Sequence, residues 1–307
     1  MFQLVNPYVK YSYEQMTHDA QKLLGQFGCV IKMGSIGKTY QNREILLFRM
    51  GTGPKKILLV GAHHGREYIS SAYLMAIMEY YCQAIYHPNL ISQYSLSKIL
   101  DEHTFYIVPM LNPDGVNLSI FGRRAATTAA MKMPRISGGY ETWKANINGV
   151  DLNRHYPCLW EEKYSTVLSP ASELFKGYAP ATEAEVRTLM RLCHTVDFHI
   201  AITFHAKGEE IYFLDSNSLG LFSRSKPIAV EMARSSGYHI MPVSSDPAVY
   251  AAGFENWFRA EFNRPGILVE LTPYRNGPIP HNMYLFDSIC FSKAKHLPIC
   301  YLNKNLL

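Results

Sequence analysis

The pattern of apolar and polar positions divides the chain into segments with the periods of strands and helices. Short apolar runs predict strands at 29–33, 44–50, 57–60, 104–110, 198–204 and 266–271. Apolar residues at helical spacing predict helices at 12–27, 67–85, 93–101, 182–196 and 283–297. Because strands alternate with helices, the pattern predicts an α/β fold: a mixed, mainly parallel twisted sheet with helices on both faces.

Two local signals mark where helices begin. Ser12-Tyr-Glu-Gln15 and Thr182-Glu-Ala-Glu185 are typical of capping boxes. The polar segment 112–148 shows little periodicity, and a loop of that length in a compact domain is usually functional. No repeat, low-complexity tract or linker divides the chain, so we expect residues 1–307 to form a single domain.

Composition and charge narrow the possible partners. Hydrophobic residues make up 48% and charged residues 18%, as in a globular protein with a buried core. The net charge of +5 is spread along the chain without a basic stripe, which argues against nucleic-acid binding. No apolar stretch approaches the roughly 18 residues of a membrane span.

The first residues do not resemble a signal peptide, and the six cysteines form no C-x-x-C pair, so we expect a cytoplasmic protein with reduced thiols. The oligomeric state is not specified by the sequence.

Candidate chemistry gathers where predicted strands end. His64 and Glu67 follow the apolar run Ile57–Val60, His205 follows the strand 198–204, and Glu270 lies near the end of 266–271. Taken alone, His64 and Glu67 are more often a helix cap or a surface pair, His205 a core histidine, and Glu270 an ion-pair partner. Since ligands bind at the carboxyl ends of strands in such sheets, we expect the four to form one site. Two imidazoles and a carboxylate suit a catalytic zinc ion, and a second carboxylate suits a base.

Several motifs together resemble the zinc metallocarboxypeptidases of the carboxypeptidase A superfamily. They are His64-Gly-Arg-Glu67, Asn112-Pro-Asp-Gly115, Gly149-Val-Asp-Leu-Asn-Arg154, Phe204-His205 and Glu270. The resemblance implies a carboxypeptidase-like fold and one zinc ion per chain, bound by His64, Glu67 and His205. It implies that Glu270 is the catalytic base and that Asn153 and Arg154 bind the terminal carboxylate of the substrate. It also implies a substrate contact for Arg66.

Two positions depart from the family pattern. Where the family has its oxyanion-stabilising arginine, this chain has Lys144, which we take as the first candidate, with Arg123 and Arg124 as alternatives. A lysine is a point charge without the fork of a guanidinium, so the geometry would differ. Where the family has a tyrosine that closes over the substrate, this chain has Ala248, and Tyr250 two residues later is the candidate.

Shorter strings indicate the substrate. Tyr11–Met16, Trp143–Asn146 and Gly149–Asn153 resemble the bacterial γ-D-glutamyl-L-diamino acid peptidases. The resemblance implies hydrolysis of the amide between γ-D-glutamate and a terminal diaminopimelate or lysine in small peptides derived from peptidoglycan. Glu255 matches the position at the base of the family's specificity pocket, where a carboxylate favours a cationic side chain. The alternative for Glu255 is a solvent-exposed position at a helix start. Competing functions are a conventional carboxypeptidase that releases C-terminal lysine or arginine, and a zinc deacylase.

Overall fold

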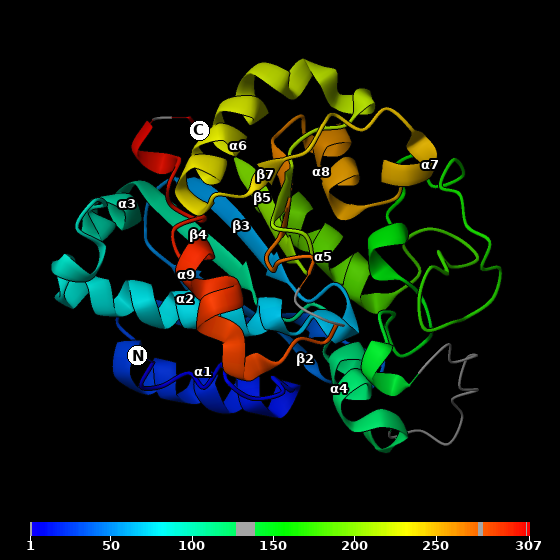
Figure 1. The fold of residues 1–307 in the computed structure, drawn as a ribbon, viewed down its shortest axis with the longest axis horizontal. Coiled ribbons are helices and arrows are strands. Elements are labelled where there is room, and N and C mark those ends of the chain that lie inside the picture. The colour runs from blue at the N-terminus through cyan, green and yellow to red at the C-terminus, as the bar shows by residue number, and fades with distance from the viewer. Residues whose placement is uncertain (1, 127–138, 276–278, 305) are drawn as a thin grey trace.

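The chain folds around a twisted, eight-stranded sheet in the order β1-β2-β4-β3-β5-β8-β6-β7 (Figure 1). The computed structural model describes residues 2–126, 139–275, 279–304 and 306–307. The strands are β1 Ile31–Lys38, β2 Glu44–Met50, β3 Lys55–Gly61, β4 His103–Val108, β5 Ile200–His205, β6 Glu210–Tyr212, β7 His239–Ile240 and β8 Gly266–Glu270.

The centre of the sheet is parallel and both sides contain antiparallel pairs. β4, β3, β5 and β8 run in one direction, whereas β2 pairs antiparallel with β1 and β4, and β6 pairs antiparallel with β8. The predicted mixed, mainly parallel sheet is therefore confirmed. The carboxyl ends of β3, β5 and β8 meet at one edge, where the candidate site residues follow.

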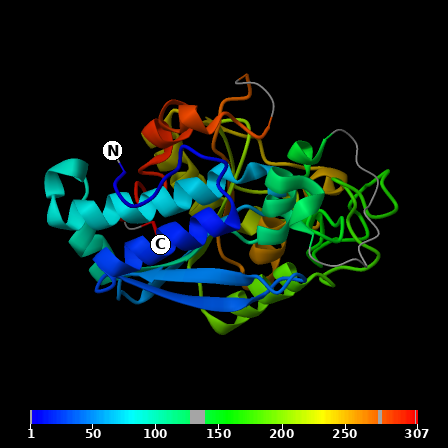
Figure 2. The same cartoon turned by 90° about the horizontal axis from the view of Figure 1, so that it is seen from below.

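Helices cover both faces of the sheet (Figures 1 and 2). They are α1 Tyr13–Phe27, α2 Ile69–Tyr86, α3 Leu96–Glu102, α4 Pro113–Phe121, α5 Ala184–Thr195, α6 Phe222–Ser236, α7 Pro247–Tyr250, α8 Phe254–Phe262 and α9 Ser292–Ala294. None of the helices in the described ranges is long and apolar enough to cross a lipid bilayer.

Alternation along the central strands creates two cores. Ile57 and Leu59 of β3 pack in one apolar cluster with α1, α2 and α6. Leu58 and Val60 point the other way, into a cluster with α5 and α8. Successive side chains of a strand point to opposite faces, so a continuous apolar run is what a strand covered on both faces requires. In Figure 2 the β1–β2 hairpin likewise lies between α1 and α5.

The helix-start predictions had different outcomes. The Ser12 side chain accepts a hydrogen bond from the Gln15 amide, as predicted. The prediction at Thr182 was wrong: α5 has Glu183 at its N-cap without a side-chain cap. The Thr182 hydroxyl instead lies 3.0 Å from Nε2 of His155, so a tertiary contact takes up the group that would have capped the helix.

Two longer segments also differ from prediction. The segment 112–148 was expected to be a loop but contains α4, whose first turn is capped by the Asn112 side chain at 2.9 Å from the Gly115 amide; residues 127–138 lie outside the described residues. An asparagine cap followed by proline favours a helix start, but the low periodicity of the whole segment pointed to a loop. The expected single helix 283–297 is instead a 3-10 turn, a π-helical turn over Asp287–Phe291 and the short α9.

Candidate active site

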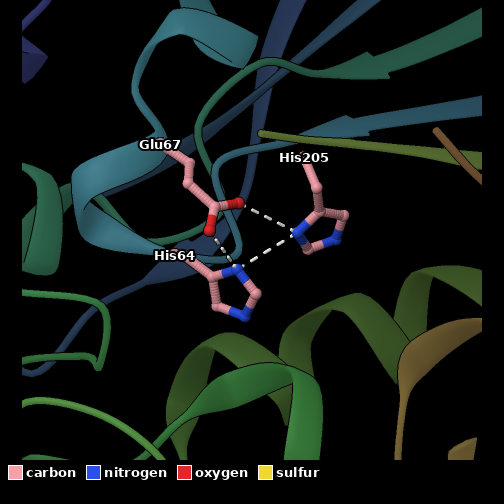
Figure 3. A group of neighbouring side chains, drawn as sticks. All are labelled: His64, Glu67 and His205. Atoms are coloured by element: carbon pink, nitrogen blue, oxygen red, sulfur yellow. Dashed lines mark hydrogen bonds and ion pairs between the residues drawn. The ribbon is translucent and has the colours of Figure 1, made fainter. Parts of the chain in front are cut away.

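Three side chains from two strand ends converge on one point (Figure 3). His64 follows β3, Glu67 ends the 3-10 turn Gly65–Glu67, and His205 is the last residue of β5. The Nδ1 atoms of His64 and His205 lie 3.1 Å apart. One carboxylate oxygen of Glu67, Oε1, lies 3.0 Å from Nδ1 of His64. The other, Oε2, lies 3.1 Å from Nδ1 of His205. All three residues are buried.

This donor set fits a zinc ion. The three ligand atoms lie within 4.8 Å of one another. Ligands about 2.0–2.1 Å from a tetrahedral zinc ion lie roughly 3.3 Å from each other, close to the measured separations. Burial alone would raise the pKa of Glu67, but the neighbouring imidazoles of His64 and His205 hold it well below its usual range. The site therefore offers two imidazole nitrogens and an ionised carboxylate to a cation.

Asp151 connects the three-residue cluster to the nearby cations. Its Oδ1 lies 3.2 Å from Nε2 of His64, the ring nitrogen that faces away from the cluster. Its Oδ2 lies 3.5 Å from Nζ of Lys144 and 3.3 Å from Nε of Arg154. Burial acts to raise the pKa of this fully buried carboxyl, yet Lys144 and His64 hold it well below its usual range. Carboxylates that bind the second nitrogen of a ligating histidine fix its tautomer and orientation.

Glu270 lies directly beside His205, because these two residues are register partners in the β5–β8 pair. The residue is partly exposed, but its Oε2 atom is buried and has no hydrogen-bond partner among the described residues. Burial of the carboxyl, followed by repulsion from Glu67, raises the pKa of Glu270 to about 8. A cation held by the neighbouring cluster would favour the ionised form, which a base requires.

A cavity of about 390 Å³ opens next to these residues. Of the predicted site residues, His64, His205, Glu270, Lys144, Asn153, Arg154, Tyr250 and Glu255 line it. The Oδ1 atom of Asn153 accepts a hydrogen bond from the Phe254 amide at 2.8 Å, which ties it to the start of α8. The Tyr250 hydroxyl lies 3.1 Å from the Ser216 hydroxyl.

A second group of charges lines the same cavity around α8. Glu255 is 5% exposed and accepts a hydrogen bond from the Thr203 hydroxyl, so it does not point to solvent. One turn later on the helix, Arg259 pairs with the buried Asp215 at 2.6 Å. Asp215 thus has a charged partner, whereas within the described ranges the carboxylate of Glu255 has only a neutral hydroxyl as its partner.

Arg66 lies outside the set of residues that line the cavity. Its guanidinium donates to the Thr142 carbonyl at 3.0 Å and pairs with Glu173 at 3.1 Å. Arg123 and Arg124 lie in the short turn after α4, also outside that set. A substrate contact for Arg66 therefore stays a prediction.

Four charged residues that line the cavity were not predicted from the sequence: Asp151, Lys163, Asp215 and Arg259. Asp151 is part of the Gly149–Arg154 motif, and this membership could have marked it as a candidate site residue. Arg259 follows Glu255 by four residues and so shares its helix face. Lys163 and Asp215 lie outside the elements that we predicted, and no pattern in the sequence marked them.

Comparison with known proteins agrees with this geometry. The profile of the zinc carboxypeptidase family, peptidase M14, matches residues 16–248. The chain belongs to the zinc carboxypeptidase family. It is therefore a hydrolase of the metallocarboxypeptidase type, in a zinc-dependent family.

Individual relatives extend this result. The chain is 32% identical to γ-D-glutamyl-L-diamino acid endopeptidase 1 of Lysinibacillus sphaericus, over 94% of this chain and 71% of that relative. Its fold is similar to that of thrombin activatable fibrinolysis inhibitor, with a TM-score of 0.73 at 15% identity, over 96% of this chain and 74% of the other. It is also similar to carboxypeptidase A from Helicoverpa armigera, with a TM-score of 0.68 at 19% identity, over 96% and 73% of the two chains. The expected carboxypeptidase-like fold is confirmed.

Proposed function

We propose that this protein hydrolyses the amide between γ-D-glutamate and a terminal L-diamino acid, diaminopimelate or lysine, in peptides derived from peptidoglycan. The observation that carries the proposal is the 32% identity, over 94% of the chain, to an enzyme named for that bond. The buried Glu255 in the cavity wall supports it, since a carboxylate with only a neutral partner favours the ammonium group of a diamino acid.

In the proposed mechanism, His64, Glu67 and His205 hold one zinc ion per chain. When bound, zinc supplies a Lewis acid that polarises the scissile carbonyl and makes water acidic enough to react at neutral pH. Glu270 accepts the proton of the attacking water and then transfers it to the nitrogen of the leaving amine. Its place beside His205 puts the base next to the zinc ligands.

Cationic side chains complete the proposed site. Lys144 lies on the cavity wall and stabilises the negative charge that develops on the carbonyl oxygen. Asn153 and Arg154 bind the terminal carboxylate of the substrate, and Arg154 keeps both Nη groups for it because only its Nε has a partner in the described part of the chain. Tyr250 contacts the substrate from α7.

A conventional carboxypeptidase that releases C-terminal basic residues is the second candidate. The Glu255 carboxylate in the cavity wall favours this candidate too, because it would bind the ammonium group of an ordinary C-terminal lysine equally well. The two candidates differ in the acyl side of the substrate, so only a substrate comparison separates them.

The test compares L-Ala-γ-D-Glu-diaminopimelate and L-Ala-γ-D-Glu-L-Lys with an N-acylated α-linked dipeptide that ends in lysine. We expect release of the diamino acid from the γ-linked peptides with the higher kcat/KM. If the zinc-loaded protein cuts the α-linked dipeptide and leaves the γ-linked peptides intact, the proposed substrate is wrong.

Two variants test the proposed base. Glu270→Gln keeps the size of the side chain and should lower kcat by at least about 10²-fold, within the usual range for loss of a general base. Glu261→Gln is the control, because Glu261 lies near the end of α8, pairs with His194 at 3.9 Å and does not line the cavity. Activity of Glu270→Gln equal to that of the control would remove Glu270 from the mechanism.

A further inference from the structure

Lys163 places an ammonium group in the wall of the active-site cavity, with no carboxylate partner among the described residues. The residue is 6% exposed and lines the cavity together with Arg154 and Lys144. Its only hydrogen bond among the described residues goes to the Val249 carbonyl. Within the same part of the chain, no carboxylate lies at ion-pair distance from it.

Positive charge is in excess at this end of the cavity. Lys144, Arg154 and Lys163 bring three cations, and among the described residues the only carboxylate in contact with any of them is that of Asp151. Asp151 already contacts His64 and accepts from the Leu174 amide at 3.3 Å. Burial, and then repulsion from Arg154, lowers the pKa of Lys163 to about 8. A buried ammonium without a counter-ion costs folding free energy, so the arrangement suits an anion that arrives with the substrate.

We propose that Lys163 binds the terminal carboxylate of the substrate together with Arg154. An ammonium has three N–H donors, and the Val249 carbonyl uses one of them, so two are left for a ligand. Ala248 and Val249, which lie beside these cations, have no side-chain donor. The proposal rests on the carboxypeptidase activity of the family and is independent of the γ-D-glutamyl part of the substrate.

If Lys163 had only a structural role, its hydrogen bond to the Val249 carbonyl would hold α7 in position. Lys163→Gln separates the two roles, because an amide still offers an N–H to that carbonyl but has no charge. Lys163→Arg keeps the charge and should restore binding. Lys176→Gln is the matched control: Lys176 also donates to a backbone carbonyl, that of Trp160 at 2.8 Å, but it does not line the cavity.

The first experiment measures KM and kcat with the γ-linked peptide ending in lysine and with the α-linked dipeptide ending in lysine. Each peptide is used as the free acid and as the C-terminal amide. For Lys163→Gln we expect KM for the free acids to rise about 10- to 100-fold, the range for a lost hydrogen bond to a charged group. KM for the amides and kcat should change little, Lys163→Arg should recover most of the loss, and Lys176→Gln should behave as wild type.

Equal changes for acid and amide, or no change for either, would overturn the role of Lys163. If only the α-linked dipeptide is cut, the proposed substrate fails while the role of Lys163 is still tested on that dipeptide. Should Lys163→Gln fail to fold, the wild-type protein alone provides the test, through competitive inhibition by N-acetyl-L-lysine and by its amide.

In that second experiment, the preference for the acid over the amide should decrease as the pH rises from 7 to 9.5. Lys163 loses its proton in that interval, because burial lowers its pKa to about 8. The charged groups that act on Lys163 are Arg154, Asp151, Lys144 and Asp246. A preference that does not change with pH would overturn the proposal.

Discussion

Replacing Asp151 by asparagine should weaken zinc binding without changing any of the three proposed zinc ligands. The Oδ1 atom of Asp151 lies 3.2 Å from Nε2 of His64, while Nδ1 of the same ring faces the cluster. An asparagine of the same size can still accept from the Leu174 amide, which lies 3.3 Å from Oδ2. It cannot supply the negative charge that orients the imidazole and strengthens it as a ligand.

The expected magnitude follows from this single contact. Loss of the carboxylate partner of a metal-binding histidine typically weakens metal affinity 10- to 100-fold, which corresponds to about 1.4–2.8 kcal/mol. The assay is competition for zinc between the protein and a chelator of known affinity, followed at equilibrium. Wild type and Asp151→Asn are compared at the same pH, since zinc competes with protons for the ligands.

Asp114→Asn is the matched control for the loss of a buried, paired carboxylate. Asp114 is fully buried, pairs with Arg43 at 2.7 Å and accepts from the Gln41 amide, and within the described residues no hydrogen bond or ion pair joins it to a proposed zinc ligand. Its replacement should lower stability and leave the zinc affinity unchanged. A zinc affinity of Asp151→Asn within about twofold of that of wild type would refute the reasoning, since twofold is well below the range for such partners.

Three further predictions concern stability. Glu79→Ala should lower the free energy of unfolding by roughly 2–4 kcal/mol, because the Glu79 carboxylate accepts from the backbone amides of Gln3, Leu4 and Val5; an unchanged urea midpoint would contradict this. Glu185→Gln should gain stability relative to wild type as the pH rises from about 5 to about 8. Burial raises the pKa of Glu185 to about 8, so the folded wild type keeps a proton that the unfolded chain releases, and wild-type stability falls in that window; parallel curves of melting temperature against pH would refute it. Removal of zinc by a chelator should lower the melting temperature, since zinc at about 1,000 times its Kd stabilises the folded state by about 4 kcal/mol; calorimetry with and without chelator checks this.

The site residues at the ends of strands could be predicted from the sequence. His64, His205 and Glu270 each follow an apolar run, and parallel strands bring such positions to one edge. Whether Glu255 is buried was left open, because helical periodicity alone does not tell which face of a short helix meets the cavity. α4 was missed because the segment 112–148 as a whole shows little periodicity and was expected to be a loop.

Lys163 could not be predicted for a different reason. It lies between the short turn at Leu152–Arg154 and α5, in a segment of the described chain without long helices or strands. Its position depends on a contact with Val249, 86 residues later. Tertiary contacts of this kind leave no period in the sequence, and the same holds for the contact between Asp215 and Arg259, 44 residues apart.

The pairing of His205 with Glu270 has a consequence for how this enzyme can diversify. Neighbouring strands lie about 4.8 Å apart, so the backbone ladder sets the spacing between a proposed zinc ligand and the proposed base. The residues that give the cavity its charge, including Lys163 and Glu255, lie on segments that join or cover the strands. Insertions and substitutions in those segments can alter the preferred side chain while the hydrolytic pair keeps its spacing. A one-residue deletion within β8 would instead turn the base to the opposite face of the sheet. Libraries for new specificity should therefore vary 159–178 and 244–256 and leave the β5–β8 register intact.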